Sequence, residues 1–303
     1  MTEPSPTFRL RRAIPDDSRA AFDVFLPSIR DLADRLNSSW EVEPEAQWRR
    51  MQYLFDHLAA HSAEWWIAED AATSEPIGYA RSIERGGLFE LSEFFVHPGR
   101  QQAGVGAALL EHAFPPGRGE VRAIIATTDI RAQVRYYRAG TVARFPIAAL
   151  EGVPRAEMAP ADLEAVRLAR GAREMDEVRR IERVVLEFDR GGEMDWLAER
   201  REGYLYRRGE RTLGFAFVGP DGVGPIAALD SGDQPSILNH VEARAVAQGI
   251  AELTLETPMV NEVAVRHLLD RGYRMDSFYT FLMSSRPFGQ FDRYIGMSPP
   301  FVL

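Results

Sequence analysis

The feature that most constrains this chain is an internal repeat with an offset of 132 residues (261 minus 129). Two stretches share their spacing of acidic or amide, alanine and glycine positions: Asp129-x-x-Ala132-x-x-x-Tyr136-x-x-x-Gly140 reappears as Asn261-x-x-Ala264-x-x-x-Leu268-x-x-x-Gly272. One ungapped offset predicts two copies of one fold. A chain of 303 residues is about twice the usual domain size. We therefore expect two domains, at residues 1–150 and 151–303.

Composition narrows the class of protein. The hydrophobic share of 45% and the charged share of 27% are those of a soluble globular protein. Cysteine is absent, which excludes disulfides, thiolate zinc sites and acyl groups carried on a protein thiol. A net charge of -9 argues against a broad nucleic-acid surface. No apolar run reaches membrane-spanning length, so we expect a cytoplasmic protein without metal, membrane or nucleic-acid partners.

Hydrophobic periodicity predicts the elements of each copy. In the first copy we expect strands at 8–12, 65–69, 77–84, 88–96, 121–127 and 141–149, with helices at about 16–29, 45–61, 104–114 and 131–139. After a turn-like boundary at 151–154, a helical region is predicted at 161–186, and the second copy then repeats the element order of the first.

The segment Gln101-Gln102-Ala103-Gly104-Val105-Gly106 joins a predicted strand to a predicted helix. Backbone N–H groups at a helix N-terminus, together with the helix dipole, favour an anion such as a pyrophosphate. A side chain at Gly104 or Gly106 would keep the backbone from approaching phosphate oxygens closely, and Arg100 adds positive charge beside the loop. For an isolated motif of this length, a plain glycine turn is the alternative.

In this context the sequence resembles the GNAT superfamily of acyl-CoA-dependent N-acyltransferases. Val96-His97-Pro98 followed by Gln101-x-x-Gly104-x-Gly106 is similar to the family's acyl-CoA loop, and Asp129-x-x-Ala132-x-x-x-Tyr136 to its later helix, where Asn is commoner than Asp. The resemblance covers about residues 8–149. It implies an α/β (α+β) fold of two tandem GNAT-like domains, each a mixed, mostly antiparallel sheet flanked by helices, similar in architecture to tandem members such as mycothiol synthase.

The resemblance also implies residue roles. Tyr136 would be the general acid toward the leaving thiolate, with Tyr137 as its neighbour. Backbone N–H groups near Phe94 to Val96 would bind pantetheine and polarise the thioester. The implied co-substrate is acetyl-CoA, and the residues implied to hold it are Phe94, Phe95, Val96, Arg100, Gln101, Gln102, Ala103, Gly104, Val105, Gly106, Asp129 and Ala132.

An amine attacks a thioester in its neutral form, so a carboxylate with a raised pKa, or a water held by one, is the natural base. Glu90 and Glu93 lie on the strand before the loop. Glu90 precedes Gln101 by eleven residues, which resembles the spacing of the glutamate base in histone-type acetyltransferases, so we rank it above Glu93. Alternation puts the two on opposite faces of an ideal strand, and we expect the other to be a solvated edge charge.

The acceptor is expected to be a small-molecule amine or a peptide. Trp40 and Glu41, in the connection at 37–43, are candidates to hold its positive charge, although a capped helix start explains the same residues. We expect a monomer with an internal pseudo-dimer, or a weak homo-oligomer. A non-catalytic acyl-CoA-binding or interaction protein is the alternative function.

The second copy lacks the chemistry of the first. The offset carries Gln101, Gly104, Gly106 and Tyr136 onto Asp233, Ser236, Leu238 and Leu268. Acidic side chains would repel a pyrophosphate, and a leucine adds bulk where a glycine is needed. We therefore predict one acyl-CoA site per chain, in the N-terminal half. The segments 291–294 and 298–303 are predicted to form an ordered tail closing over a groove.

Overall fold

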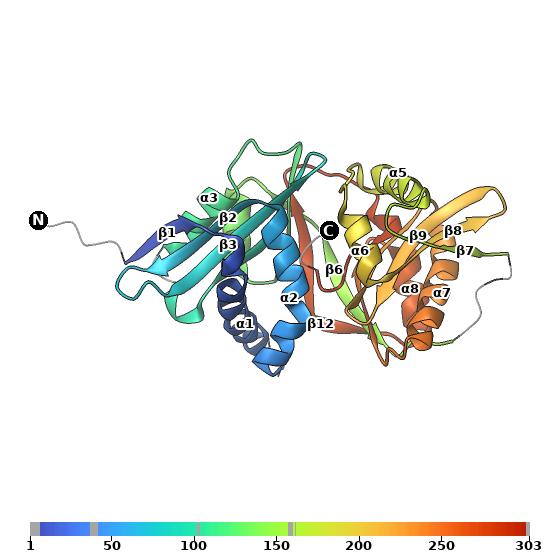
Figure 1. The fold of residues 1–303 in the computed structure, drawn as a ribbon, viewed down its shortest axis with the longest axis horizontal. Coiled ribbons are helices and arrows are strands. Elements are labelled where there is room, and N and C mark those ends of the chain that lie inside the picture. Colours follow the sequence, from blue (N-terminus) through green and yellow to red (C-terminus); the bar gives the residue numbers. More distant parts are fainter. Residues whose placement is uncertain (1–6, 37–41, 102–103, 157–159, 161, 301–303) are drawn as a thin grey trace, which may run out of the picture. The chain divides into compact units, whose positions relative to one another are not determined.

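The computed structural model describes residues 7–36, 42–101, 104–156, 160 and 162–300 (Figure 1). The chain divides into two compact units. The first unit comprises Met1–Glu84, Leu88–Ile124 and Asp129–Val142, and the second comprises Arg85–Gly87, Ile125–Thr128 and Ala143–Leu303. We expected the boundary at residue 150, whereas the strand that begins at Val142 groups with the second unit from Ala143 onward.

The first half of the chain contains one strand, two helices and three strands, followed by helices and strands in alternation. In order these are β1 (Phe8–Arg12), α1 (Ser18–Arg35), α2 (Pro44–His61), β2 (Ser62–Asp70), β3 (Pro76–Arg85), β4 (Leu88–Val96), α3 (Val105–Ala113), β5 (Val121–Ala126), α4 (Ile130–Arg138) and β6 (Val142–Gly152). The sheet of the first unit runs β1-β2-β3-β4-β5. Strands β1, β2 and β3 pair antiparallel, whereas β4 and β5 are parallel.

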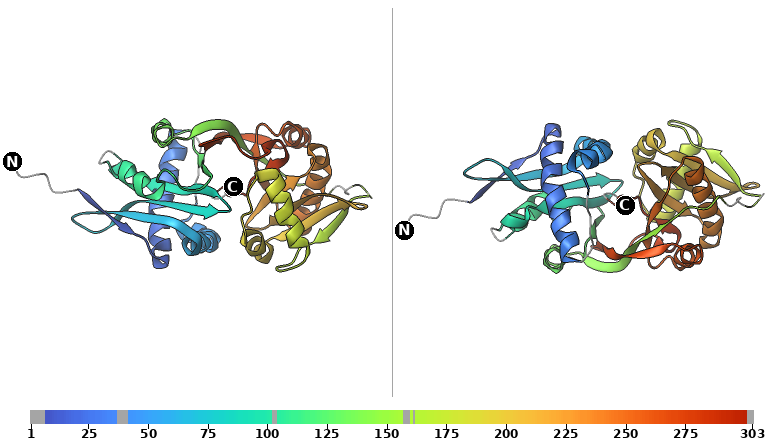
Figure 2. Two further views of the ribbon diagram at one scale, coloured as in Figure 1. Left: turned by 90° about the horizontal axis from the view of Figure 1, so that it is seen from above. Right: turned by 90° about the horizontal axis from the view of Figure 1, so that it is seen from below.

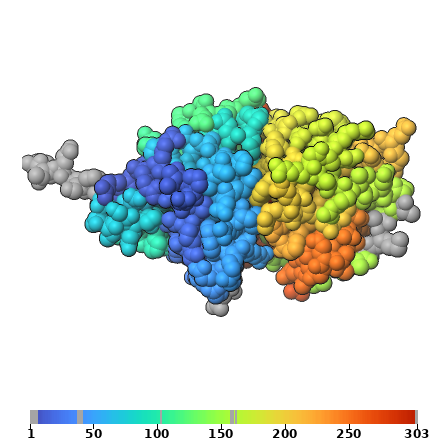
Figure 3. Space-filling view, in the orientation of Figure 1, coloured from blue at the N-terminus to red at the C-terminus, as the bar shows by residue number. Residues whose placement is uncertain are grey.

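The second half repeats this order: β7 (Glu164–Arg167), α5 (Glu174–Leu186), α6 (Glu193–Arg200), β8 (Glu202–Arg208), β9 (Arg211–Gly219), β10 (Gly222–Ala228), α7 (Gln234–Ala247), β11 (Leu253–Pro258), α8 (Glu262–Asp270) and β12 (Arg274–Ser284). A short strand, β13 (Tyr294–Ile295), follows. In the second unit, hydrogen-bonded strands follow the order β12-β6-β11, and a separate five-stranded sheet has the order β13-β10-β9-β8-β7. Helices α7 and α8 form part of the surface in Figure 3.

The offset of 132 holds at the level of structure. Strand β5, helix α4 and strand β6 begin and end 132 residues before β11, α8 and β12. Both helices are capped by the matched residue: the Asp129 side chain accepts a hydrogen bond from the Arg131 N–H, and the Asn261 side chain accepts one from the Ala264 N–H. The predicted tandem repeat is confirmed.

The expected helical region at 161–186 is partly wrong. Its first part contains β7, which pairs antiparallel with β8 from Glu164 opposite Arg207 to Arg167 opposite Tyr204. Pairing along a neighbouring strand overrides the weak helical preference of such a short segment. The helix α5 begins at Glu174, after Gly171 has adopted a positive φ of 68°.

Helices cover both faces of the first unit's sheet (Figure 2). Phe95 of β4 packs against Phe25 of α1, with ring centroids 5.0 Å apart. Its neighbour Phe94 lies instead next to Gly106 of α3. Because successive side chains of a strand point to opposite faces, α1 and α3 lie on opposite sides of β4. No helix among the described residues is both long and apolar enough to cross a membrane.

Candidate functional site

The candidate site lies where the pairing between β4 and β5 ends. The parallel register between these strands runs from Leu88 opposite Val121 to Leu91 opposite Ile124. The rest of β4, Ser92–Val96, lies beyond that register, and the neighbours of β4 in the sheet are β3 and β5. Backbone groups at the end of β4 therefore face the diverging side, where an extended ligand can pair with them.

Two glycines shape the start of α3 for different reasons. Gly104 is the N-cap and has a φ of 80°, a conformation that L side chains rarely adopt, and apart from its chain neighbours no described residue lies within 4 Å of where a Cβ would stand. At Gly106 a Cβ would lie 3.2 Å from the Phe94 ring. Gly104 thus leaves open space at the helix N-terminus, whereas Gly106 lets α3 approach β4.

Tyr136 of α4 lies beside Phe94 and forms a cluster with it and Gly106. Its ring meets the Phe94 ring edge to face, with centroids 6.1 Å apart, and the residue is 6% exposed. Burial, and then the negative charge of Asp129, raise the pKa of the Tyr136 phenol above its ordinary value of 10. The phenol stays protonated at neutral pH, as a general acid must. Tyr137, by contrast, is 49% exposed.

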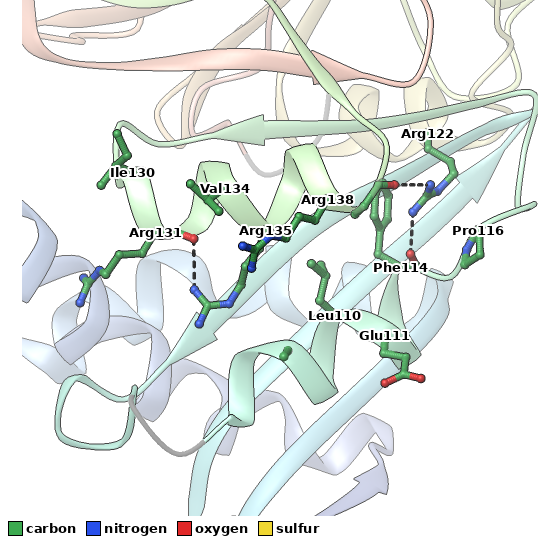
Figure 4. A pocket seen from close by; sticks show the side chains of 12 residues that line it. Leu110, Glu111, Phe114, Pro116, Arg122, Ile130, Arg131, Val134, Arg135 and Arg138 are labelled. Carbon is green, nitrogen blue, oxygen red and sulfur yellow. Dashed lines mark hydrogen bonds between the residues drawn. The ribbon is translucent and has the colours of Figure 1, made fainter.

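Helices α3 and α4 line a groove of about 720 Å³ (Figure 4). Its apolar lining includes Leu110 and Phe114 of the α3 side and Val134 of α4. Its basic lining comes from Arg122, Arg131, Arg135 and Arg138. The Nε atom of Arg135 would lie 3.7 Å from a Cβ at Gly106, so a cation stands beside the N-terminal turn of α3. Both features attract anions.

The two candidate bases are both buried, so the expectation that one is a solvated edge charge is wrong. Glu90 is 1% exposed and Glu93 is 2% exposed. Glu93 accepts a hydrogen bond of 2.8 Å from the Tyr79 hydroxyl and forms an ion pair with Arg81, whose side chain is fully buried. This ion pair compensates the buried charge of Glu93 and occupies its oxygens.

A family model for an acetyltransferase (GNAT) domain matches residues 61–140, the segment that contains this cluster. The chain carries a GNAT domain.

Solved structures share the fold over nearly the whole chain. A putative acetyltransferase from Pyrococcus horikoshii has a TM-score of 0.74 at 15% identity, covering 97% of this chain and 95% of that one. A GCN5-related N-acetyltransferase from Sphaerobacter thermophilus has a TM-score of 0.62 at 15% identity, covering 94% and 98%. A tandem GNAT protein from the clavulanic acid biosynthesis pathway has a TM-score of 0.58 at 13% identity, covering 92% and 99%. No curated protein matches the sequence significantly.

The other residues predicted to hold the cofactor of the GNAT domain serve the loop and the helix caps. The Gln101 side-chain amide donates to the Val96 carbonyl at 3.3 Å, which ties the loop to the end of β4. Arg100 forms an ion pair of 2.8 Å with Asp70. Asp129 caps α4 and pairs with Arg131 and Arg35, and the Arg131 hydrogen bonds hold its pKa at about 2 against the opposing effect of burial. Ala132 is partly buried in α4.

Four predicted site residues, Gln102, Ala103, Trp40 and Glu41, lie outside the described residues. The structure adds residues that the sequence reasoning missed, namely Arg135, Arg81 and Tyr79. Arg135 precedes Tyr136 in the motif, so its charge was a visible signal, whereas nothing in the sequence indicates that Arg81 meets Glu93. Among the described residues, no group of three or more His, Asp or Glu side chains is arranged to hold a metal ion.

Proposed function

We propose that the first unit transfers an acetyl group from acetyl-CoA directly to a primary amine of a small molecule or peptide. The observation that carries this proposal is the convergence of three features of the GNAT domain. The diverging end of β4, the N-terminus of α3 and the buried Tyr136 phenol meet around Phe94 and Gly106. Such a path suits an extended donor with a phosphate group part-way along it.

The donor would occupy this path in three parts. The pantetheine runs along Phe94 to Val96, whose backbone donors also polarise the thioester carbonyl. The pyrophosphate binds at the helix start formed by Gly104, Val105 and Gly106, with Gln101, Gln102 and Ala103 of the loop. The nucleotide end enters the groove between α3 and α4. A volume of about 720 Å³ suits such a group.

The positive charge beside the phosphates comes from Arg135 in this proposal. The Arg135 guanidinium donates a hydrogen bond of 3.1 Å to the Arg131 carbonyl, a neutral acceptor that does not compensate its positive charge. Arg100, the cation suggested by the loop sequence, is engaged by Asp70. Arg100 then stabilises the loop from outside, and Arg135 contacts the donor.

In the reaction, the amine nitrogen attacks the thioester carbon, a C–N bond forms and the C–S bond breaks. Glu90, directly or through a water, takes the proton that the amine loses. Tyr136 donates its proton to the departing sulfur, so that free CoA leaves as the thiol. Glu93 keeps a structural role in the ion pair with Arg81. The Glu90 proton returns to the Tyr136 phenolate through solvent before the next turnover, so the amide and the thiol together account for all atoms.

The residues that we propose for acceptor binding lie outside the described part of the chain. Trp40 and Glu41 would hold the ammonium group of the acceptor before it loses its proton. We propose that the second unit binds no acyl-CoA, so each chain has one catalytic site. We also propose that the protein acts in the cytoplasm, as a monomer with an internal pseudo-dimer or as a weak homo-oligomer.

The purified chain should be incubated with acetyl-CoA and a panel of primary amines, and release of free thiol should be followed. We expect amine-dependent thiol release, which Tyr136→Phe lowers by at least about tenfold and Glu90→Gln by a similar factor, since acid and base groups contribute 10²–10⁴-fold. Tyr137→Phe is the matched control. Binding of acetyl-CoA in calorimetry without turnover of any amine would favour the non-catalytic alternative. Absence of binding would refute both.

A further inference from the structure

Arg122 of β5 connects the ends of the two helices that line the groove. Its Nη1 donates to the Ala139 carbonyl and its Nη2 donates to the Phe114 carbonyl, both at 2.7 Å (Figure 4). Phe114 is the C-cap of α3, and Ala139 is the C-cap of α4. A single side chain, 9% exposed, therefore binds both helix C-termini at once.

The chemistry of this contact suits arginine. The last carbonyls of a helix have no partners within the helix and carry the negative end of its dipole. The planar guanidinium presents donors in a fixed fork, so the positions of the two carbonyls become fixed relative to each other. The same guanidinium lies over the Phe114 ring, 4.1 Å from its centroid. Burial lowers the pKa of Arg122, yet guanidinium remains protonated in proteins.

The matched position in the second unit has no such fork. The offset of 132 carries Arg122 onto Thr254, whose hydroxyl reaches Glu151 at 3.5 Å. There the helices are joined directly: His267 of α8 bonds the Asn239 side chain of α7 at 3.0 Å, and Glu242 of α7 forms an ion pair with Arg271. Arg122 thus belongs to the unit whose helices line a groove.

We propose that Arg122 is a positioning residue for the acyl donor. By holding the C-termini of α3 and α4 at a fixed separation, it sets the width of the groove between them and so the affinity for the nucleotide end of acyl-CoA. This inference rests on the proposed function of the groove. The groove runs along α3 to Phe114, whereas the proposed pyrophosphate site is at the N-terminus of α3, so the part of the donor that Arg122 would influence is the nucleotide.

The test uses the full chain and two donors, acetyl-CoA and acetyl-pantetheine, which lacks the nucleotide. We expect Arg122→Met to raise the KM for acetyl-CoA by roughly tenfold and to change kcat by less than about twofold. The kcat/KM for acetyl-pantetheine should stay unchanged. Arg122→Lys should recover part of the affinity, because an ammonium keeps the charge but not the fork. Arg274→Met, at the exposed start of β12, is the control.

Each outcome decides the matter. An equal loss with both donors would mean that Arg122 only supports the fold, and an unchanged KM for acetyl-CoA would mean that it does not set the groove; either overturns the proposal. If Arg122→Met does not fold, the comparison is made with Arg122→Lys. If the wild-type chain acetylates no amine, the proposed function fails, and calorimetry with CoA and pantetheine still tests whether Arg122 acts on nucleotide binding.

Discussion

The helix pairs α3/α4 and α7/α8 hold matched places in the repeat but are built in opposite ways. Helix α3 begins at Val105, after the open Gly104, whereas α7 begins at Gln234, three residues before the position matched to Val105. The residue matched to Gly104 is Ser236, inside α7. The first pair lines a groove, and the second pair is joined by side chains.

The anion site and the strand gap of the second unit are filled by the chain itself. The Asp233 carboxylate stands at the N-terminus of α7 and accepts hydrogen bonds from Arg208 and Arg211, at 2.9 and 2.7 Å. Strand β13 pairs with β10, Ile226 opposite Ile295, and the next residue, Gly296, donates its N–H to the Glu256 carbonyl of β11 at 2.9 Å. At the places where we propose that the donor binds in the first unit, the second unit thus carries its own side chains and its own strand.

The largest effect is expected for the group that has no counterpart in the second unit. Replacing Tyr136 with Phe should lower kcat by roughly 10²-fold, since the offset places Leu268 at this position and no other acid is proposed. The binding constant for acetyl-CoA should change little. Steady-state rates of thiol release measure this, with Tyr137→Phe as control. Equal losses in both variants would contradict the assignment.

The next effect concerns the tight approach of α3 to β4. Gly106→Leu copies Leu238 of the second unit into the first, where the added Cβ would lie only 3.2 Å from the Phe94 ring. Overpacking that costs about 1.4–2.8 kcal/mol, within its usual range, should weaken acetyl-CoA binding by between about 10- and 100-fold, as measured by calorimetry, with circular dichroism to confirm folding.

The reciprocal change sharpens the same comparison. Leu238→Gly should create no acyl-CoA site in the second unit, because the ion pairs of Asp233 and the pairing of β13 remain. We expect one acetyl-CoA per chain in this variant as in the wild type. A stoichiometry of two would mean that a single bulky residue, and not the filling of the site, separates the two units.

A smaller effect is expected for the cation beside α3. Arg135→Ala should raise the Kd for acetyl-CoA by about tenfold at low salt, the scale of one charge-assisted hydrogen bond, and by less at high salt because exposed charges are screened. Calorimetry at two ionic strengths measures this. Arg266→Ala, on the matched helix α8, is the control. A loss that does not depend on salt would argue against contact with a phosphate.

The smallest effect is a pH-dependent difference in stability. Glu256 matches Ile124 of the first unit, and burial, followed by the charges of Glu151 and Asp276, raises its pKa from 4.5 to about 7. The folded state therefore holds a proton that the unfolded state loses, so the free energy of unfolding falls as pH rises between about 4.5 and 7.

A neutral side chain at position 256 should prevent this fall in the free energy of unfolding. Glu256→Gln should raise the free energy of unfolding at pH 8 by on the order of 2 kcal/mol, a rise of a few degrees in Tm, with a much smaller difference at pH 4. Thermal unfolding followed by circular dichroism measures both, and Glu210→Gln in an exposed turn is the control. The same shift at both pH values would rule out a role for this proton.

Much of the fold could be predicted from the sequence because its signals are local or periodic. The offset read from Asp129 and Asn261 gave the correct pairing of β5, α4 and β6 with β11, α8 and β12. The strand β7 was missed because its partner β8 lies about 40 residues away in the chain, and pairing at that separation leaves little local signal. Order at 291–294 was expected, but the pairing of β13 with β10 was not, and residues 301–303 of the expected tail lie outside the described part of the chain.

The site was predictable where a motif fixes both residue type and position, as at Gly104, Gly106 and Tyr136. It was not predictable where side chains meet only through folding. Glu93 looked like a solvated charge, yet burial beside Arg81 gives it a structural partner. The reason for Gly106 also differs from the one argued from sequence, since the close neighbour is Phe94.

The diverging end of β4 has a consequence for solubility. Beyond Leu91, backbone donors and acceptors on the β5 side of β4 have no strand partner among the described residues. An uncovered strand edge is a template for the addition of another extended chain. In the second unit β13 pairs along the matched edge, whereas in the first unit the proposed donor would cover it. Acyl-CoA would then act as a removable covering strand, and the unliganded protein should be the more aggregation-prone form.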